Sequence, residues 1–299
     1  MDWVEENILC PKCQLPVIKE ERIHGYTCLA CRSSYPLHNG IIPVFIPDYE
    51  SHLGKIREKM ISNPSFFERN QTDYYERGPY SVHLRRRQSY MEETVCRFRG
   101  KAGTRPLNIV DIGCGDGVNL GWLSNSKDQV YGTDYSHVRL ERAHSKVPGA
   151  RLIMMDVHSK VFRPGFFDIV VCNHVLEHIE DYGAVLGNIR SMLRRDGVLL
   201  VGVPNEGAKW WQLAYDLEPD ILKATDHVNF FKADELAGAC ESIGFRVADL
   251  KYMGYGLPHF TADSVFRAQP GVDDFMEELG RKFFRDQANC FFLVLENHR

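Results

Sequence analysis

The stretch Asp111-Ile112-Gly113-Cys114-Gly115-Asp116-Gly117 decides the fold of this 299-residue chain. It follows the apolar run Leu107–Ile112 and leads into a segment with helical spacing, which predicts a strand, a glycine turn and a helix. Glycine accepts positive φ and lets the backbone approach a ligand, and the N–H groups at a helix start favour a polar or anionic one. A dinucleotide-binding turn beginning at Gly113 would need glycine or alanine at position 118, where Val118 stands. The turn therefore predicts a ligand site of another kind.

Short apolar runs and helical patterns alternate after this turn. The clearest expected helix is Tyr182–Arg195, in which Val185 and Ile189 share one face. Asp196-Gly197 provides its stop signal. Alternation of this kind, followed by a late pair of strands, predicts an α/β fold with a doubly wound sheet of seven strands. The expected strands are Leu107–Ile112, Gln129–Thr133, Arg151–Met155, Phe167–Cys172, Gly197–Val203, Phe245–Met253 and Cys290–Glu296.

Polar residues stand at the ends of these strands. Asp134 ends the second strand about 20 residues after Asp111, where a carboxylate can accept both hydroxyls of a ribose. Asp156 follows the third strand, and Asn173-His174 ends the fourth. An ordinary turn acid is the alternative for each aspartate, because Asp favours turns. Three acids at strand ends together with one glycine turn favour a shared ligand site.

Together these residues resemble the Rossmann-like (class I) methyltransferases that use S-adenosylmethionine (SAM). The resemblance covers about residues 107–296 and includes the D-x-G-x-G-x-G turn and the run Leu193–Leu199 before the fifth strand. In that family the glycines lie against the methionyl part of SAM, and the first acid joins the polar network around its amino group. The second acid binds the ribose, the third strand's end recognises adenine, and the fourth strand ends beside the methyl-transfer centre. The resemblance implies a SAM site made of Asp111, Gly113, Gly115, Gly117, Asp134, Tyr135, Asp156, Val157, Asn173 and His174.

Two C-x-x-C pairs, Cys10-Pro11-Lys12-Cys13 and Cys28-Leu29-Ala30-Cys31, lie near the N-terminus. Four thiolates in two such pairs can surround Zn²⁺ tetrahedrally, and a closed set of four ligands makes the site structural. A redox pair or four unrelated core cysteines are the alternatives. We expect buried packing for the scattered remainder, which comprises Cys96, Cys114, Cys172, Cys240 and Cys290.

The stretch Tyr35–Phe45 follows these pairs, and with them it resembles a small zinc-binding family that activates methyltransferases. Members of that family act as a separate subunit or are fused to the enzyme. The resemblance implies a zinc-ribbon domain over residues 1–47 and no need for a separate zinc-binding activator subunit. Zinc ribbons also precede some ribosomal RNA guanine methyltransferases, so the ribbon leaves the substrate class open. We expect a helical linker or lid over residues 48–105 and the methyltransferase domain over residues 106–299.

The composition is that of a globular protein, with 44% hydrophobic and 25% charged residues and a net charge of −4. A net negative charge gives no general reason to bind nucleic acid. The acidic N-terminus Met1–Glu6 does not resemble a signal peptide. Apolar runs such as Phe166–Val175 fall short of the ~20 residues that a membrane-spanning helix needs. We therefore expect a cytoplasmic protein without a membrane span.

Two histidines are candidates for the general base that helps a hydroxyl acceptor react, because histidine titrates near neutral pH. His178 follows the fourth strand, and Glu177-His178 resembles an element common in small-molecule and quinone-type members, where it often faces the active site. His227 lies in an expected cap insertion, about residues 205–231, where the family commonly builds its acceptor pocket. Helix capping or packing for His178, and core packing for His227, remain the alternatives.

Three arginines at positions 85–87 lie in the helical segment before the first strand, where we expect an amphipathic helix through Arg87–Phe98. We expect them to form a solvated helix face. In relatives this segment folds over the cofactor, so a cofactor contact by Tyr75 or by one arginine is the alternative.

These features favour an enzyme that transfers a methyl group to an oxygen or nitrogen of a small metabolite or saccharide. An RNA base methyltransferase that grips RNA with its zinc ribbon is the first alternative. The basic residues of the ribbon are partly balanced by Glu20 and Glu21, so they form no convincing basic patch. The Asn/Asp-Pro-Pro-aromatic signature of exocyclic-amine methylation is also absent after the fourth strand. A catalytically inactive SAM-binding partner protein is the second alternative.

Overall fold

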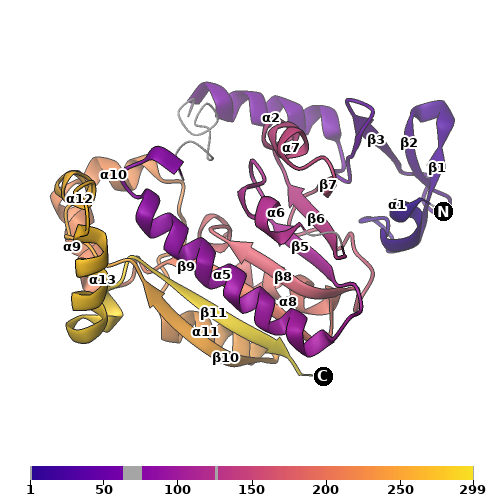
Figure 1. Cartoon of the computed structure of the whole chain (residues 1–299). Helices are drawn as coiled ribbons and strands as arrows, with labels where there is room; N and C mark the ends of the chain where they lie inside the picture. The colour runs from indigo at the N-terminus through magenta and orange to yellow at the C-terminus, as the bar shows by residue number, and fades with distance from the viewer. Residues whose placement is uncertain (1, 63–75, 125–126, 299) are drawn as a thin grey trace. The chain divides into compact units, whose positions relative to one another are not determined.

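The computed structural model describes residues 2–62, 76–124 and 127–298. Strands and helices alternate along most of this length, as the sequence predicts (Figure 1). The chain divides into two compact units, which are described separately below. The first comprises Met1–Thr72, Ala102–Val170 and Asn188–Gly197, and the second comprises Asp73–Lys101, Val171–Gly187 and Val198–Arg299.

A seven-stranded sheet has the strand order β10-β11-β9-β8-β5-β6-β7. The pairs β5–β6 and β6–β7 are parallel, whereas β10–β11 and β11–β9 are antiparallel. This order confirms the predicted α/β class and the seven strands, because each buried apolar run became one strand. The strands are β5 (Asn108–Ile112), β6 (Gln129–Asp134), β7 (Arg151–Met154), β8 (Phe167–Asn173), β9 (Leu193–Pro204), β10 (Phe245–Met253) and β11 (Cys290–Asn297).

In the first unit, α6 (Val118–Leu123) and α7 (His137–Lys146) pack against β5, β6 and β7. Figure 1 shows both helices beside these strands. Leu120 and Leu140 carry the contact, since neither has any exposed surface. The glycine turn between β5 and α6 is thereby held at the carboxyl end of a buried strand.

The predicted helix Tyr182–Arg195 is shorter than expected. The helix α8 (Tyr182–Met192) stops before Leu193, which is buried and begins β9. Asp196 has a φ of 61°, and a Cβ on Gly197 would lie 2.9 Å from the carbonyl oxygen of Arg194, so the backbone turns tightly here. Helical spacing alone does not separate a last helical turn from the start of a strand.

The N-terminal part of the first unit forms its own four-stranded sheet in the order β1-β2-β3-β4. Glycine is required at the start of β2, because a Cβ on Gly25 would lie 2.3 Å from the carbonyl oxygen of Tyr35. Val44 then forms a parallel bridge with Met154, which attaches this small sheet beside β7. Its elements, with the helix that follows, are α1 (Trp3–Asn7), β1 (Val17–Glu20), β2 (Gly25–Cys28), β3 (Ser34–His38), β4 (Ile42–Pro43) and α2 (Tyr49–Ser62).

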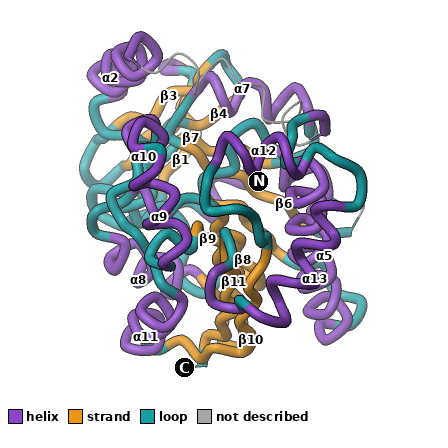
Figure 2. Tube along the Cα trace, turned by 90° about the vertical axis from the view of Figure 1, so that its left-hand side faces the viewer, coloured by secondary structure: helices purple, strands orange, loops and turns teal. Residues whose placement is uncertain are grey.

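The second unit carries most of the remaining helices, and α11 packs against β10, beside which it lies in Figure 2. Its helices are α5 (Ser81–Ala102), α9 (Lys209–Leu217), α10 (Pro219–Ala224), α11 (Ala233–Ile243), α12 (Phe260–Arg267) and α13 (Val272–Phe283). In neither unit does a helix of the described chain have the length and apolar character needed to cross a bilayer.

Candidate functional site

The glycine turn of the first unit has the backbone that its sequence predicts. Gly113, Gly115 and Gly117 have φ values of 69°, 53° and 77°. Such values favour glycine, because a Cβ crowds the neighbouring backbone in this conformation. A Cβ on Gly117 would also lie 3.0 Å from the Cβ of Ala143 on α7. The glycines therefore let a ligand approach the backbone of the turn closely, whereas the N–H groups of Cys114, Gly115 and Gly117 already donate within the protein.

Asp111 ends β5 as a carboxyl group with 1% of its surface exposed. Burial raises its pKa to about 8, although a hydrogen bond with the Asn119 side chain opposes this shift. Its Oδ2 atom has no hydrogen-bond partner among the residues that the structure describes. A cationic hydrogen-bond donor would satisfy the unused oxygen of this buried carboxyl group. The amino group of SAM is a donor of that kind.

Asp134 ends β6 and is held in place by the backbone. Its Oδ2 accepts a hydrogen bond from the Gly115 N–H at 3.0 Å, and its Oδ1 accepts one from the Ser136 N–H at 2.8 Å. Burial raises its pKa, and the N–H of Ser136 with the charge of Arg139 works in the opposite direction. Each carboxylate oxygen has a further lone pair, so both can still accept a ligand hydroxyl.

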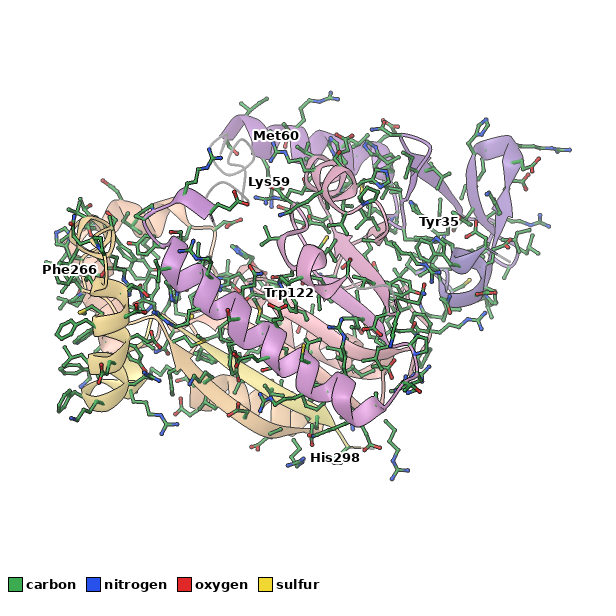
Figure 3. All side chains as sticks on the ribbon, in the orientation of Figure 1. Tyr35, Lys59, Met60, Trp122, Phe266 and His298 are labelled. Atoms are coloured by element: carbon green, nitrogen blue, oxygen red, sulfur yellow. The ribbon has the colours of Figure 1, made fainter. Side chains whose placement is uncertain are left out.

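Tyr135, the next residue, is fixed through its carbonyl oxygen, which accepts a 2.7 Å hydrogen bond from His52 Nε2. The Nζ atom of Lys59 on α2, labelled in Figure 3, lies 5.2 Å from the centre of the Tyr135 ring. Both partners belong to the first unit.

Asp156 and Val157 follow β7. The Asp156 side chain is 56% exposed, and its Oδ1 accepts a hydrogen bond from the His158 backbone N–H at 2.8 Å. The same oxygen lies 2.9 Å from the ring nitrogen Nδ1 of His158. This geometry is that of a turn acid, the alternative that the sequence left open, and a role in adenine recognition stays a prediction.

Asn173 and His174 belong to the second unit, at the end of β8. The Arg87 guanidinium donates to Asn173 Oδ1 at 3.4 Å. His174 has a φ of 56°, and its Nδ1 lies 3.0 Å from Oε1 of Glu177. Glu177 is fully buried, and the hydrogen bond and charge of His174 outweigh burial and lower its pKa.

The structure brings the two predicted catalytic histidines together in the second unit. The ring centroids of His178 and His227 are 4.7 Å apart. Their segments are tied by Asn229, whose side-chain amide donates to the carbonyl oxygens of Leu176 and Ile179. Residues far apart in sequence thus form one cluster at the carboxyl end of β8.

Each histidine of the cluster has a carboxylate behind its Nδ1 atom. His178 Nδ1 lies 2.8 Å from Asp226 Oδ1, and His227 Nδ1 lies 2.8 Å from Oε1 of the fully buried Glu206. The Glu206 carboxylate also accepts a hydrogen bond from the Tyr215 hydroxyl. Burial alone would lower the pKa of His178, but Asp226 and Glu177 outweigh it and raise that pKa. A carboxylate at Nδ1 fixes the ring and increases the basicity of the other ring nitrogen.

This arrangement supports two kinds of chemistry. A histidine with a raised pKa and an orienting carboxylate can accept a proton from a hydroxyl group. Ligand atoms of Glu177, His178 and His227 also lie within 4.8 Å of one another, so these side chains could hold a metal ion. Sequence reasoning missed Glu206 and Asp226, although Glu206 stands three residues after an expected strand.

The four N-terminal cysteines converge in the first unit. Cys10 Sγ lies 3.5 Å from Cys31 Sγ, and Cys13 Sγ lies 3.4 Å from Cys28 Sγ. All four sulfur atoms lie within 4.8 Å of one another. Tetrahedral Zn–S bonds of ~2.3 Å separate sulfur atoms by roughly 3.8 Å, so the set fits Zn²⁺. The Tyr35 hydroxyl and Cys10 Sγ are 3.0 Å apart, which places a polar group behind one ligand.

Two expectations about side-chain exposure are wrong. Arg85 is exposed, but Arg86 pairs with Asp273 at 2.5 Å and Arg87 is only 7% exposed, so the arginines form no solvated face. Cys96 is exposed on α5, whereas the other four scattered cysteines are buried as expected. Tyr75 lies outside the described residues.

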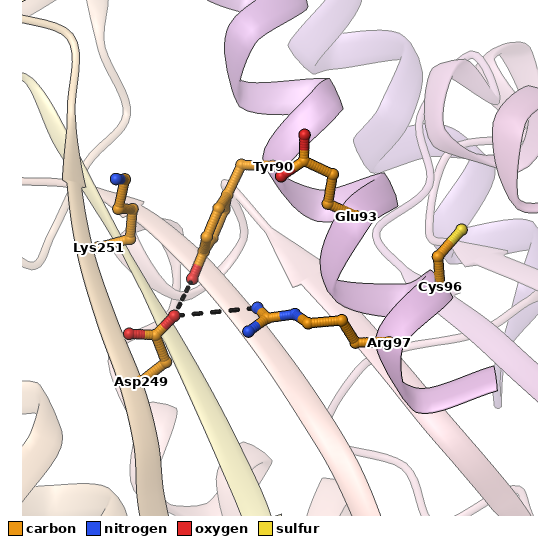
Figure 4. Close-up of a pocket in the computed structure, with 6 residues that line it drawn as sticks. All are labelled: Tyr90, Glu93, Cys96, Arg97, Asp249 and Lys251. Atoms are coloured by element: carbon orange, nitrogen blue, oxygen red, sulfur yellow. Dashed lines mark hydrogen bonds and ion pairs between the residues drawn. The ribbon is translucent and has the colours of Figure 1, made fainter. Parts of the chain in front are cut away.

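An open pocket of about 750 Å³ lies between α5 and β10 in the second unit (Figure 4). Two side chains of α5 reach Asp249 across the opening, since Tyr90 donates to it at 3.0 Å and Arg97 lies 3.9 Å from the same carboxylate. No residue of the predicted site lines it.

Comparison with known proteins gives consistent matches. A family model described as a methyltransferase domain matches residues 83–250. A ubiquinone biosynthesis O-methyltransferase of Ralstonia nicotianae is 27% identical over 165 residues, covering 51% of this chain and 69% of the relative. One of Methylobacterium sp. (strain 4-46) is 31% identical over 202 residues, covering 61% and 81%. Magnesium protoporphyrin IX methyltransferase from Synechocystis PCC 6803, solved with bound SAH, shares the fold. It has a TM-score of 0.56 and 17% identity, over 81% of this chain and 98% of that one.

Proposed function

This chain belongs to the methyltransferase-domain family and is a SAM-dependent methyltransferase, and from that premise we propose that it methylates a hydroxyl oxygen of a small molecule. The observation that carries the proposal is the pair His178–His227, in which each ring has a carboxylate at Nδ1. A hydroxyl must lose its proton as it attacks the methyl group, so it benefits from such a base. The relatives named O-methyltransferases support an oxygen acceptor over a nitrogen one.

SAM fits the residues of the first unit. We propose that Asp111 receives the amino group, that Gly113–Gly117 lies along the methionyl part, and that Asp134 binds the ribose hydroxyls. The Oδ2 atom of Asp111, which has no partner among the described residues, and the positive φ values of the three glycines support these roles. When bound, SAM supplies an electrophilic methyl group on a sulfonium. The proposed contacts of Tyr135, Asp156, Val157, Asn173 and His174 with the cofactor rest on the sequence resemblance.

His178 is the proposed base, and His227 is the residue that positions it. The raised pKa of His178 lets it take a proton from an acceptor hydroxyl, and Asp226 stabilises the imidazolium that forms. His227, held by Glu206, packs edge-on against the His178 ring. The acceptor is a small metabolite or a saccharide.

We propose a structural Zn²⁺ bound by the four N-terminal cysteines in a ribbon domain over residues 1–47. The convergence of their sulfur atoms supports it. With residues 48–105 as linker or lid and residues 106–299 as the methyltransferase domain, the chain would need no separate zinc-binding activator.

The test supplies the purified protein with methyl-labelled SAM and a cell extract, then separates small molecules, glycans, RNA and protein. Label in small molecules or free saccharides is the expected result. Label in RNA would replace this proposal by the RNA alternative, and SAM binding without transfer would favour a catalytically inactive protein.

A matched pair of variants separates the base from general damage to the fold. His178→Gln should lower transfer by about 10²- to 10⁴-fold with SAM affinity retained. His144→Gln, on the last turn of α7, is the control and should transfer at the wild-type rate.

A further inference from the structure

The helix α13 in the second unit presents an apolar stripe to solvent. Phe275, Leu279 and Phe283 are spaced four residues apart and therefore share one face. The side chains of Phe275 and Phe283 are among the most exposed large apolar groups, at 59% and 61%. Large aromatic groups seldom remain in water in a row, so the stripe calls for an explanation.

The helix α13 packs closely against the rest of the second unit, so poor packing of the helix does not explain the exposed stripe. Its adjoining face buries Met276 and Gly280. A Cβ on Gly280 would lie 2.0 Å from the ring of Tyr255, which shows how closely α13 approaches that residue. Glu277 fixes the same face by accepting the Gly254 N–H at 2.9 Å.

Neighbouring helices enlarge the apolar surface. Phe284, directly after α13, packs against Trp210 of α9 with ring centroids 5.0 Å apart, and Trp211 packs against Phe260 of α12. Outward side chains of α12 are also apolar, with Val265 65% exposed and Phe266, labelled in Figure 3, 39% exposed. The apolar area over these helices is on the order of 600 Å², which approaches the ~800 Å² per partner of a stable interface.

Charges along α13 are separated by sign. Asp274 and Glu278 lie in its first two turns, whereas Arg281 and Lys282 lie in its last turn. Glu278 forms no ion pair with any residue in the described part of the chain, and Lys282 lies over the Phe283 ring at 5.3 Å. An acid and a base that form no ion pair within the described residues thus border the apolar stripe four residues apart.

We propose that this surface binds a second copy of the chain, with the two α13 helices antiparallel about a two-fold axis near Leu279. A two-fold interface must be self-complementary, so each residue of one copy meets its counterpart in the other. In this arrangement Phe275 of one copy packs against Phe283 of the second, and Glu278 faces Lys282 of the second. The helix carries four acids and two bases, so it lacks the excess of cations that an anionic lipid surface would require, and a second copy fits it better.

The experiment measures the molar mass of the full chain by sedimentation equilibrium between about 1 and 100 µM. The expected mass at the upper end is twice the 34.4 kDa of one chain. Phe275→Glu should raise the dissociation constant at least about 100-fold. Glu278→Lys and Lys282→Glu should each raise it about 10-fold, and the double variant should restore it because both charges are exchanged.

Controls and contrary results are defined in the same measurement. Glu241→Lys, an exposed acid on α11, should leave the dimer intact and shows that a charge change alone is harmless. Circular dichroism of each variant verifies folding. A monomer at 100 µM overturns the proposal, and so does a dimer unaffected by Phe275→Glu. Phe275-dependent binding of the monomer to phosphatidylglycerol vesicles would assign the surface to lipid instead.

Discussion

Asp111→Asn is expected to stabilise the ligand-free protein near neutral pH and at the same time to weaken SAM binding. The carboxyl of Asp111 is buried, which raises its pKa from the ordinary 3.8 to about 8. A carboxyl with a raised folded-state pKa destabilises the fold increasingly as the pH rises from about 4 to about 8, because the unfolded chain ionises first. The destabilisation is absent below the unfolded pKa.

The size of the effect follows from this shift. At pH 7 the linkage relation gives a cost of about 4 kcal/mol for keeping Asp111 in the fold. Asparagine removes that cost but buries an amide whose partners are incomplete, at about 1–2 kcal/mol. The net gain is therefore about 2–3 kcal/mol, or roughly 4–8 °C in the melting temperature of a chain this large.

Binding should change in the opposite direction. The variant loses a charged hydrogen-bond acceptor for the amino group of SAM, so the dissociation constant should rise about 10- to 100-fold. Thermal unfolding at pH 5 and pH 8 and calorimetric SAM titration measure both effects. Asp156→Asn, in an exposed turn, is the control and should not raise the melting temperature. A melting temperature of Asp111→Asn that is unchanged or lower at pH 8, or unchanged SAM affinity, would refute the reasoning.

Three further predictions concern the cysteine cluster, His178 and Gly117. Metal analysis of the purified protein should find about one zinc per chain, and Cys10→Ser should lower it toward zero; a metal-free wild type would exclude the ribbon. The acidic limb of the pH–rate profile should lie above pH 6.5, because His178 acts as a base only when neutral and its pKa is raised. Asp226→Asn removes a group that raises this pKa, so the acidic limb should move to lower pH. If the limb does not move, His178 is not the base. Gly117→Ala should cost about 1–3 kcal/mol of stability, measured by urea unfolding, because of its φ of 77° and its contact with Ala143.

The sequence predicts the sheet closely because each strand is a short apolar run between polar ends. The range Phe245–Met253 agrees with β10 at both ends, and most other strands differ by one or two residues. The predicted end of α8 lies three residues beyond the observed end at Met192. Arg194 and Arg195 suit the last turn of a helix, but they also fit the turn at the start of β9. Local patterns fix the existence of elements better than their limits.

The candidate site was predictable only where its residues adjoin a motif. The glycine turn and the four cysteines carry their geometry in their spacing, which accounts for the positive φ values of the turn and the convergence of the sulfur atoms. The carboxylates behind the two histidines are tertiary partners, since Glu206 reaches His227 and Asp226 reaches His178 only through the fold. The burial of Arg87 differs from the expectation for the same reason, because its partner Asn173 is distant in the sequence.

The measurement that tests the central claim most directly is the bond made to the transferred methyl group. The protein is supplied with SAM carrying a ¹³C methyl and with the extract fraction that accepts label, and the product is examined by ¹³C NMR. The proposed function predicts a methoxy carbon on a small molecule, formed by the wild type and lost in His178→Gln. An N-methyl or S-methyl carbon, or a methoxy carbon formed equally by the variant, would contradict it.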